Sequence, residues 1–202
     1  MKYKCITGGP ISENCYLLID EKTNQAAVVD PGFLNDVLLN EIKKYTVQRI
    51  LLTHGHFDHI WEADRLHEML GVPVCAYETE AAFAADDKQN GSLLMMYESI
   101  TCKVHEAFKD GETFQIGEVP VTVLHTPGHT AGGVIYITPD AVFTGDTLMG
   151  YSVGRCDLPT GNSAELRESL KKLAALPGNP DICGGHGPVT TLEDEKRRNP
   201  YL

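Results

Sequence analysis

The chain has 202 residues, of which 42% are hydrophobic and 22% charged, with a formal net charge of −11. This length and composition predict a single globular domain over residues 1–202. The acidic balance argues against nucleic-acid and anionic-membrane partners, since both reward clustered Lys and Arg. Because no apolar run has the length of a signal peptide or a membrane span, and no C-x-x-C pair occurs, we expect a cytoplasmic protein with reduced thiols.

The first half of the chain alternates between strand and helix patterns. C-Y-L-L-I-D and A-A-V-V-D-P-G predict two antiparallel strands joined by a turn. Apolar residues at helical spacing predict a helix over 34–45 and another over 60–70, which Gly71 ends. Short strands are expected at Val47–Leu52 and Val72–Tyr77. We expect residues 78–99, which are rich in Ala and Met, to cover the motif described below as helix or loop.

The second half returns to strands, which are separated by glycine and proline. The predicted strands are Thr113–Ile116, Val119–Leu124, Val134–Thr138, Ala141–Phe143 and Asp181–Cys183. Ser163 is the expected cap of a helix with a leucine stripe, and Pro177-Gly178 stops it. Residues 190–198 are expected to form a short polar helix. Strands that alternate with helices favour a layered α/β fold.

The sequence T-H-G-H-F-D-H follows the strand over 47–52 and crowds four ligand-type residues into one turn. Imidazole and carboxylate groups suit zinc, manganese or iron. One ion rarely takes four ligands from six consecutive residues, so two ions that share the turn are the easier geometry. The candidate ligands of this turn are His54, His56, Asp58 and His59.

Two ions require further ligands, and three polar residues stand in similar settings. His129, Asp146 and His186 each follow a predicted strand and lie beside glycine, which permits a close approach of the backbone to a site. A lone loop histidine is usually solvated, and a lone aspartate is usually a turn residue. No structural purpose explains the H-x-H-x-D-H run, however, and this strengthens the metal interpretation of all seven residues.

The motifs H-G-H-F-D-H, H-T-P-G-H-T, F-T-G-D-T and G-G-H-G, in this order, resemble the metallo-β-lactamase superfamily. The resemblance implies an αββα sandwich, with two mixed β-sheets flanked by helices and a dinuclear site on one edge. By the resemblance, His54, His56 and His129 hold the first of two divalent ions. Asp58, His59 and His186 hold the second, and Asp146 bridges both. Zinc is favoured, with iron or manganese as alternatives.

The segment T-G-D-T-L-M-G-Y-S-V-G-R-C-D-L-P-T-G-N resembles the glyoxalase II group, and the whole chain is similar to short bacterial hydroxyacylglutathione hydrolase-like enzymes. This implies cleavage of a small-molecule thioester, such as S-lactoylglutathione, by metal-activated water that Asp58 helps to orient. Only 16 residues (202 − 186) follow His186, so we expect no counterpart of the helical domain that holds glutathione in full-length glyoxalase II. We interpret the basic residues 196–198 as solvated surface.

Other activities remain open on the same residues. Persulfide dioxygenases resemble glyoxalase II and hold one iron, for which His54, His129 and Asp146 would form the 2-His-1-carboxylate set. A β-lactamase is disfavoured, because secreted β-lactamases often have Cys where this chain has Asp146. A nuclease is weaker for want of a basic groove. A non-catalytic binding module is weaker still, because it would leave the ligand set without a use.

Five further polar residues have both a structural and a functional interpretation. His125 either orients a ligand or makes an ordinary turn hydrogen bond, and Asp30 either supports the site or forms a turn. Arg155 and Asp157 are expected to form an ion pair or to border the pocket. Tyr151 is a candidate for contact with substrate.

Overall fold

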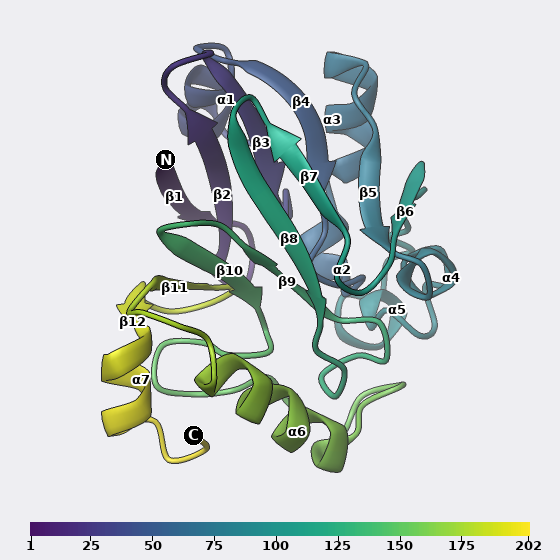
Figure 1. Ribbon diagram of the computed structural model, residues 1–202. Helices are drawn as coiled ribbons and strands as arrows, with labels where there is room; N and C mark the ends of the chain where they lie inside the picture. The colour runs from purple at the N-terminus through teal and green to yellow at the C-terminus, as the bar shows by residue number, and fades with distance from the viewer.

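Two six-stranded β-sheets form the centre of the molecule, and helices cover their outer faces (Figure 1). The structure is a computed structural model that describes residues 1–202. The first sheet contains, in spatial order, β1 (Lys2–Gly8), β2 (Glu13–Asp20), β3 (Gln25–Val29), β4 (Thr46–Leu51), β5 (Val74–Tyr77) and β6 (Glu106–Phe108). The second contains β12 (Thr190–Thr191), β11 (Asp181–Gly184), β10 (Ala141–Gly145), β9 (Val134–Ile137), β8 (Val119–His125) and β7 (Thr113–Ile116).

Both sheets are mixed. Strands β3 to β6 run parallel to one another, as do β10 and β11, whereas the remaining pairs are antiparallel. Parallel neighbours need long crossover connections, which helices commonly supply. The helices are α1 (Asp36–Ile42), α2 (Phe57–Ile60), α3 (Ala63–Leu70), α4 (Glu80–Ala84), α5 (Ser92–Met95), α6 (Ser163–Ala174) and α7 (Leu192–Arg198). None of them is long and apolar enough to cross a lipid bilayer.

Three layers of apolar side chains hold the sandwich together, because successive side chains of a strand point to opposite faces. In β2, Leu17 and Ile19 belong to the layer beneath α1 and α3. Tyr16 and Leu18 of the same strand belong to the layer between the sheets, where Tyr136 of β9 also lies. The third layer joins the second sheet to α6 and α7. The predicted αββα sandwich is therefore confirmed.

Most predicted elements lie close to their expected positions, and the strand at Thr113–Ile116 has the predicted bounds. The helix expected over 60–70 is instead divided into α2 and α3, and Gly71 ends it with a left-handed φ of 68°. Residues 78–99 contain the short helices α4 and α5. The edge strands β1 and β6 were not predicted individually, and the predicted helix over 190–198 begins only after the short strand β12.

The predicted cap of α6 is wrong. Ser163 is the first residue inside the helix, and Asn162 is the cap. The Asn162 side-chain oxygen accepts hydrogen bonds from the backbone N–H groups of Ala164 and Glu165, at 3.0 and 3.3 Å. Both Asn and Ser are good capping residues. The extended backbone of Asn162 (φ −150°, ψ 107°) gives this position the cap geometry.

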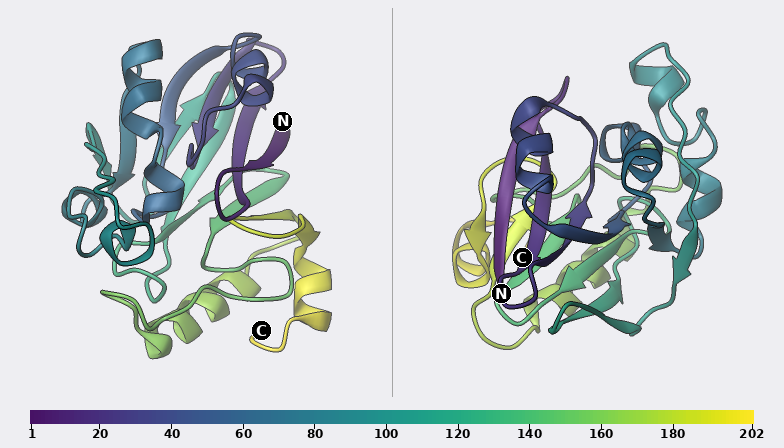
Figure 2. Two further views of the ribbon diagram at one scale, coloured as in Figure 1. Left: turned by 180° about the vertical axis from the view of Figure 1, so that it is seen from behind. Right: turned by 90° about the horizontal axis from the view of Figure 1, so that it is seen from above.

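The loops that leave β4, β8, β10 and β11 gather at one edge of the sandwich (Figures 1 and 2). They come from strands far apart in the sequence and from both sheets. Strand ends in layered α/β folds commonly carry ligand sites. All seven predicted ligand residues lie in these loops or in the adjoining α2.

Candidate metal centre

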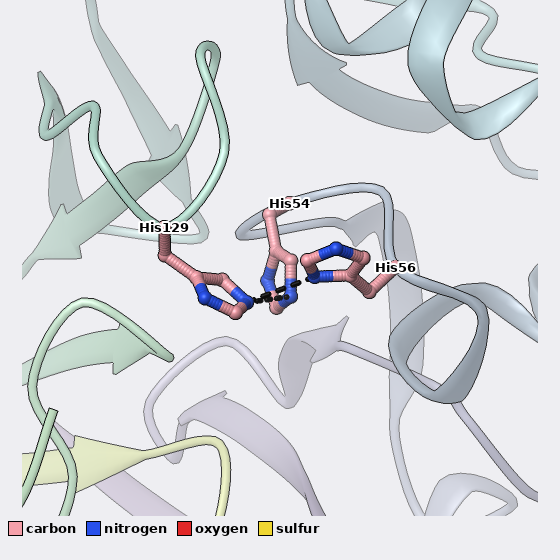
Figure 3. Close-up of side chains that lie close together, drawn as sticks. All are labelled: His54, His56 and His129. Atoms are coloured by element: carbon pink, nitrogen blue, oxygen red, sulfur yellow. Dashed lines mark hydrogen bonds between the residues drawn. The ribbon is translucent and has the colours of Figure 1, made fainter. Parts of the chain in front are cut away.

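Three imidazoles meet at this edge (Figure 3). His54 and His56 come from the loop after β4, and His129 comes from the loop after β8. The Nε2 atom of His129 lies 2.8 Å from Nδ1 of His56 and 3.2 Å from Nε2 of His54. All three side chains are buried. The structure thus brings one predicted set of three together from two loops that are 73 residues apart.

The other predicted set of three lies beside the first. Asp58 and His59 belong to α2, and His186 follows β11. Oδ2 of Asp58 lies 3.1 Å from Nε2 of His186 and 3.3 Å from Nε2 of His59. One donor atom from each of these residues falls within 4.8 Å of the other two. Because α2 begins directly after His56, its first turn places Asp58 and His59 next to the first set.

Asp146, which follows β10, lies between the two sets. Its Oδ1 is 3.5 Å from Nε2 of His59, and its Oδ2 is 3.6 Å from Nε2 of His129. Oδ2 is also 3.8 Å from Nε2 of His186. One carboxylate therefore faces donor atoms of both sets.

Two of these donor atoms have no hydrogen bond within the protein. Nε2 of His59 and Oδ1 of Asp146 are both buried without a hydrogen-bond partner. Burying a polar atom without a partner is costly, so such atoms point to a ligand. Imidazole nitrogens and a carboxylate oxygen are the donor types that bind zinc, iron and manganese. The residues present therefore fit a divalent metal ion.

The pKa values of His54, His56, Asp58 and Asp146 favour metal-binding protonation states, whereas the carboxylates of Asp58 and Asp146 outweigh burial and raise the pKa values of His59 and His186. Burial lowers the pKa of His54 well below its ordinary value and that of His56 to about 3, with the neighbouring imidazoles adding to the effect. Both rings are then neutral at pH 7, with a nitrogen lone pair available. Burial opposes ionisation of Asp58 and Asp146, but the imidazoles around them, His59 foremost, together outweigh it, so both pKa values are lowered, that of Asp146 to about 2.

A second group of contacts orients two of the imidazoles through Nδ1, the ring nitrogen that does not face the site. Nδ1 of His129 lies 2.7 Å from the carbonyl oxygen of Arg155, so Nδ1 donates and leaves the Nε2 lone pair free to face the site. Asp30 acts in the same way on His59, because its Oδ2 lies 3.0 Å from Nδ1 of that ring. Asp30 also accepts hydrogen bonds from the backbone N–H and the hydroxyl of Thr53, at 2.7 and 2.6 Å.

Asp30 has a φ of 51°, a conformation that non-glycine residues rarely adopt. Such strain persists where the surroundings over-determine it, and functional sites are a common place for it. The side-chain contacts of Asp30 thus select the interpretation in which this residue supports the site.

Glu80, in the first turn of α4, is a supporting residue that the sequence did not reveal. Its side chain is buried, and its two oxygens accept hydrogen bonds from the backbone N–H groups of Gly55 and Gly132, both at 2.8 Å. Gly55 separates His54 from His56, and Gly132 lies three residues after His129. A single carboxylate therefore joins the two loops of the first set.

The segment that carries Glu80 also explains why both of its partners are glycines. A Cβ atom on Gly55 would lie 2.9 Å from Oε2 of Glu80, and one on Gly132 would lie 2.4 Å from Oγ1 of Thr79 and 2.8 Å from Oε1 of Glu80. A side chain at either position would therefore displace the carboxylate of Glu80. The sequence E-A-A-F-A around Glu80 matches no metal or catalytic pattern. The glycines in H-G-H and A-G-G were the only available signal, since they indicate a close approach by some other group.

The remaining polar candidates have structural contacts. Nε2 of His125 lies 2.9 Å from the carbonyl oxygen of Ala131, which is an ordinary turn hydrogen bond. Arg155 forms a bidentate ion pair with Asp157, in which Nε and Nη2 lie 2.6 and 2.7 Å from the two carboxylate oxygens. Arg155 also borders the cavity at the site. Tyr151 is not among the residues that line this cavity.

The chain belongs to the metallo-β-lactamase superfamily, whose family model matches residues 8–186. Membership supports an enzyme of the metallo-hydrolase type, and the cluster of histidines and aspartates indicates that it binds divalent metal. The chain is 36% identical to a probable metallo-hydrolase, YqgX, of Bacillus subtilis, over 100% of this chain and 98% of that protein. It is 31% identical to the hydroxyacylglutathione hydrolase GloC of Haemophilus influenzae, over 100% and 98% of the two chains.

Solved structures agree with this assignment. The BLEG-1 B3 metallo-β-lactamase superposes with a TM-score of 0.93 at 34% identity and covers 100% of this chain and 99% of its own. TTHA1623, solved in a di-iron-bound form, superposes with a TM-score of 0.84 at 34% identity and covers 98% of this chain and 100% of its own. ETHE1 from Myxococcus xanthus superposes with a TM-score of 0.81 at 30% identity and covers 99% of this chain and 84% of its own.

Proposed function

We propose that the protein is a thioester hydrolase that works with two divalent metal ions. His54, His56 and His129 would hold one ion, and the set of Asp58, His59 and His186 would hold the other. Asp146 would contact both. The observation that carries this proposal is the placement of Asp146, whose carboxylate lies 3.5 Å from His59 and 3.6 Å from His129, between the two sets.

Zinc is the favoured metal, because neutral imidazoles and carboxylates in a compact site suit it well. Iron and manganese take the same donor types. The di-iron form of TTHA1623, at 34% identity, supports iron as the first alternative. The hydroxyacylglutathione hydrolase name of GloC supports a thioester substrate, such as S-lactoylglutathione or a related acyl-thiol.

When bound, divalent ions supply Lewis acidity and bring the pKa of a bound water towards neutrality. The protein contributes the orientation of the reactants. Asp58 lines the cavity and its pKa is lowered, so it is ionised at pH 7 and can accept a hydrogen bond from the attacking water. The departing thiolate does not need to be protonated as it leaves, because thiols have a pKa of about 8.5.

Persulfide oxidation with one iron is a second candidate. It would use only His54, His129 and Asp146, and the Nε2 atom of His129 lies 3.2 Å from His54 and 3.6 Å from Asp146. The hydrolase uses all seven residues, including the set of Asp58, His59 and His186, for which the dioxygenase has no role. The completeness of that set favours the hydrolase. The BLEG-1 structure makes β-lactam cleavage a third activity to test.

The experiment combines elemental analysis of the purified protein with three substrate panels: thioesters including S-lactoylglutathione, β-lactams, and persulfide with oxygen uptake. We expect two metal ions per chain and thioester cleavage. Asp146→Asn should abolish cleavage and lower metal content, whereas the matched variant Asp140→Asn, at an exposed carboxylate, should change neither. One iron per chain with persulfide-dependent oxygen uptake would reject the hydrolase in favour of the dioxygenase.

A further inference from the structure

The cavity at the candidate metal centre has a volume of about 300 Å³, and its walls differ sharply in chemistry. Its polar side chains are those of the metal centre together with Arg155. Its apolar side chains come from four separate segments: the β1–β2 turn, the start of α2, α5, and the loops after β10. They are Ile11, Phe57, Met95, Met149 and Leu158.

The apolar surface continues outside the cavity. Ile11 and Met95, at its mouth, are 41% and 42% exposed, and beside Met95 along the chain Leu94 is 64% and Tyr97 is 90% exposed. Of the eight large apolar side chains exposed on the whole molecule, five belong to the two segments that bring Ile11 and Met95 to the cavity, namely Ile11 of the β1–β2 turn and Leu93, Leu94, Met95 and Tyr97 in and beside α5. Such a concentration of exposed apolar groups marks a binding surface.

Charge recognition at the cavity is limited. Arg155 is its one cationic side chain outside the metal centre, and its guanidinium is already paired with Asp157 at 2.6 and 2.7 Å. The apolar walls offer no side-chain hydrogen bond to a hydroxyl on the acyl group. A hydroxyl on the acyl group that lies against these walls would therefore lose hydrogen bonds to water without replacement.

We propose that the preferred substrate carries an apolar acyl group longer than acetyl, which lies against Ile11, Phe57 and Met95. This inference rests on the proposed thioester hydrolysis and names its substrate class. Methionine at the mouth of the cavity suits the binding of an apolar acyl group, because its flexible thioether adapts to acyl chains of different shape. The longer part of the chain would leave the cavity over the exposed side chains of α5.

A second cavity supports assigning the apolar wall to the acyl arm. It has a volume of about 460 Å³ and shares Gly154 and Arg155 with the first cavity. It adds the polar side chains of Ser163 and Arg167, together with apolar residues of α6. The thiol carrier, which bears the polar groups of most biological thioesters, would extend in that direction, and the acyl arm would take the apolar wall.

The test is a series of thioesters of one thiol, N-acetylcysteamine, with acetyl, butanoyl, hexanoyl and octanoyl groups, assayed on the metal-loaded protein. We expect kcat/KM to rise by about two- to fourfold per methylene as apolar surface is buried, and then to level off. Ile11→Ser and Met95→Ser should each reduce the ratio of hexanoyl to acetyl kcat/KM. Val37→Ser, at an exposed apolar residue of α1 outside the cavity, should leave that ratio unchanged.

A second measurement is the calorimetric binding of S-alkyl thioethers of N-acetylcysteamine, which the protein cannot cleave. Their affinity should rise with the length of the alkyl chain and fall in the Ile11→Ser variant. Cleavage with kcat/KM independent of acyl length would overturn the acyl inference while leaving the hydrolase intact. No cleavage of any thioester by the metal-loaded protein would instead reject the proposed function itself.

Discussion

Replacing Glu80 with Gln tests whether one buried carboxylate holds the two loops of the candidate metal centre together. The carboxylate accepts hydrogen bonds from Gly55 and Gly132, both at 2.8 Å. A glutamine offers one acceptor oxygen and turns an NH₂ group towards the other backbone N–H. One buried donor then lacks a partner, which costs about 1–3 kcal/mol.

For a chain of this size, that loss lowers the melting temperature by about 2–12 °C, at about 2–4 °C per kcal/mol. The loops that carry His54, His56 and His129 should also be less well placed. Loss of a hydrogen bond that orients metal-binding residues typically weakens metal binding by about 10–100-fold. Thermal unfolding followed by circular dichroism measures the first effect, and competition with a chelator measures the second.

The matched control is Glu78→Gln, the same substitution at an exposed residue two positions away. It should change neither the melting temperature nor the affinity for metal. If Glu80→Gln behaves like Glu78→Gln in both measurements, Glu80 does not join the loops. A fall in melting temperature with unchanged metal affinity would limit Glu80 to a role in stability.

Three further predictions follow from the contacts of the structure. Asp30→Asn removes the carboxylate that faces Nδ1 of His59, and should weaken metal binding by about 10–100-fold in chelator competition. Unchanged affinity would show that Asp30 acts only as a turn residue. Asn162→Ala should destabilise the protein by about 1 kcal/mol in urea unfolding through loss of the helix cap, whereas Ser163→Ala should have a smaller effect. The reverse order would restore Ser163 as the cap. Removal of metal with a chelator should lower the melting temperature, since a metal at about 100 times its dissociation constant stabilises by about 2.7 kcal/mol; an unchanged melting temperature would argue against a bound metal.

The local part of the candidate site could be predicted from the sequence because its chemistry lies in one turn. The crowding of His54, His56, Asp58 and His59 has no structural explanation, so it points directly to a metal. His129, Asp146 and His186 could be added because each follows a strand and lies beside glycine. The αββα fold was predicted through family resemblance, and the alternating apolar residues of the strands agree with it.

The residues that support the site could not be predicted in the same way. Glu80 lies in an ordinary helical segment, and its role depends on two loops that approach it only in the folded protein. The contact between Asp30 and His59 also spans 29 residues, and the V-V-D-P-G sequence equally suits a turn. The edge strand β6 has only three residues, Glu106–Phe108, and too few positions to show a strand pattern.

The most direct test of the central claim is a titration of metal-free protein with zinc, in which bound metal and thioester hydrolysis are measured on the same samples. The proposed dinuclear site predicts that activity appears with bound metal and reaches its plateau at two ions per chain. Full thioesterase activity without metal, or no activity with two ions bound, would contradict the account.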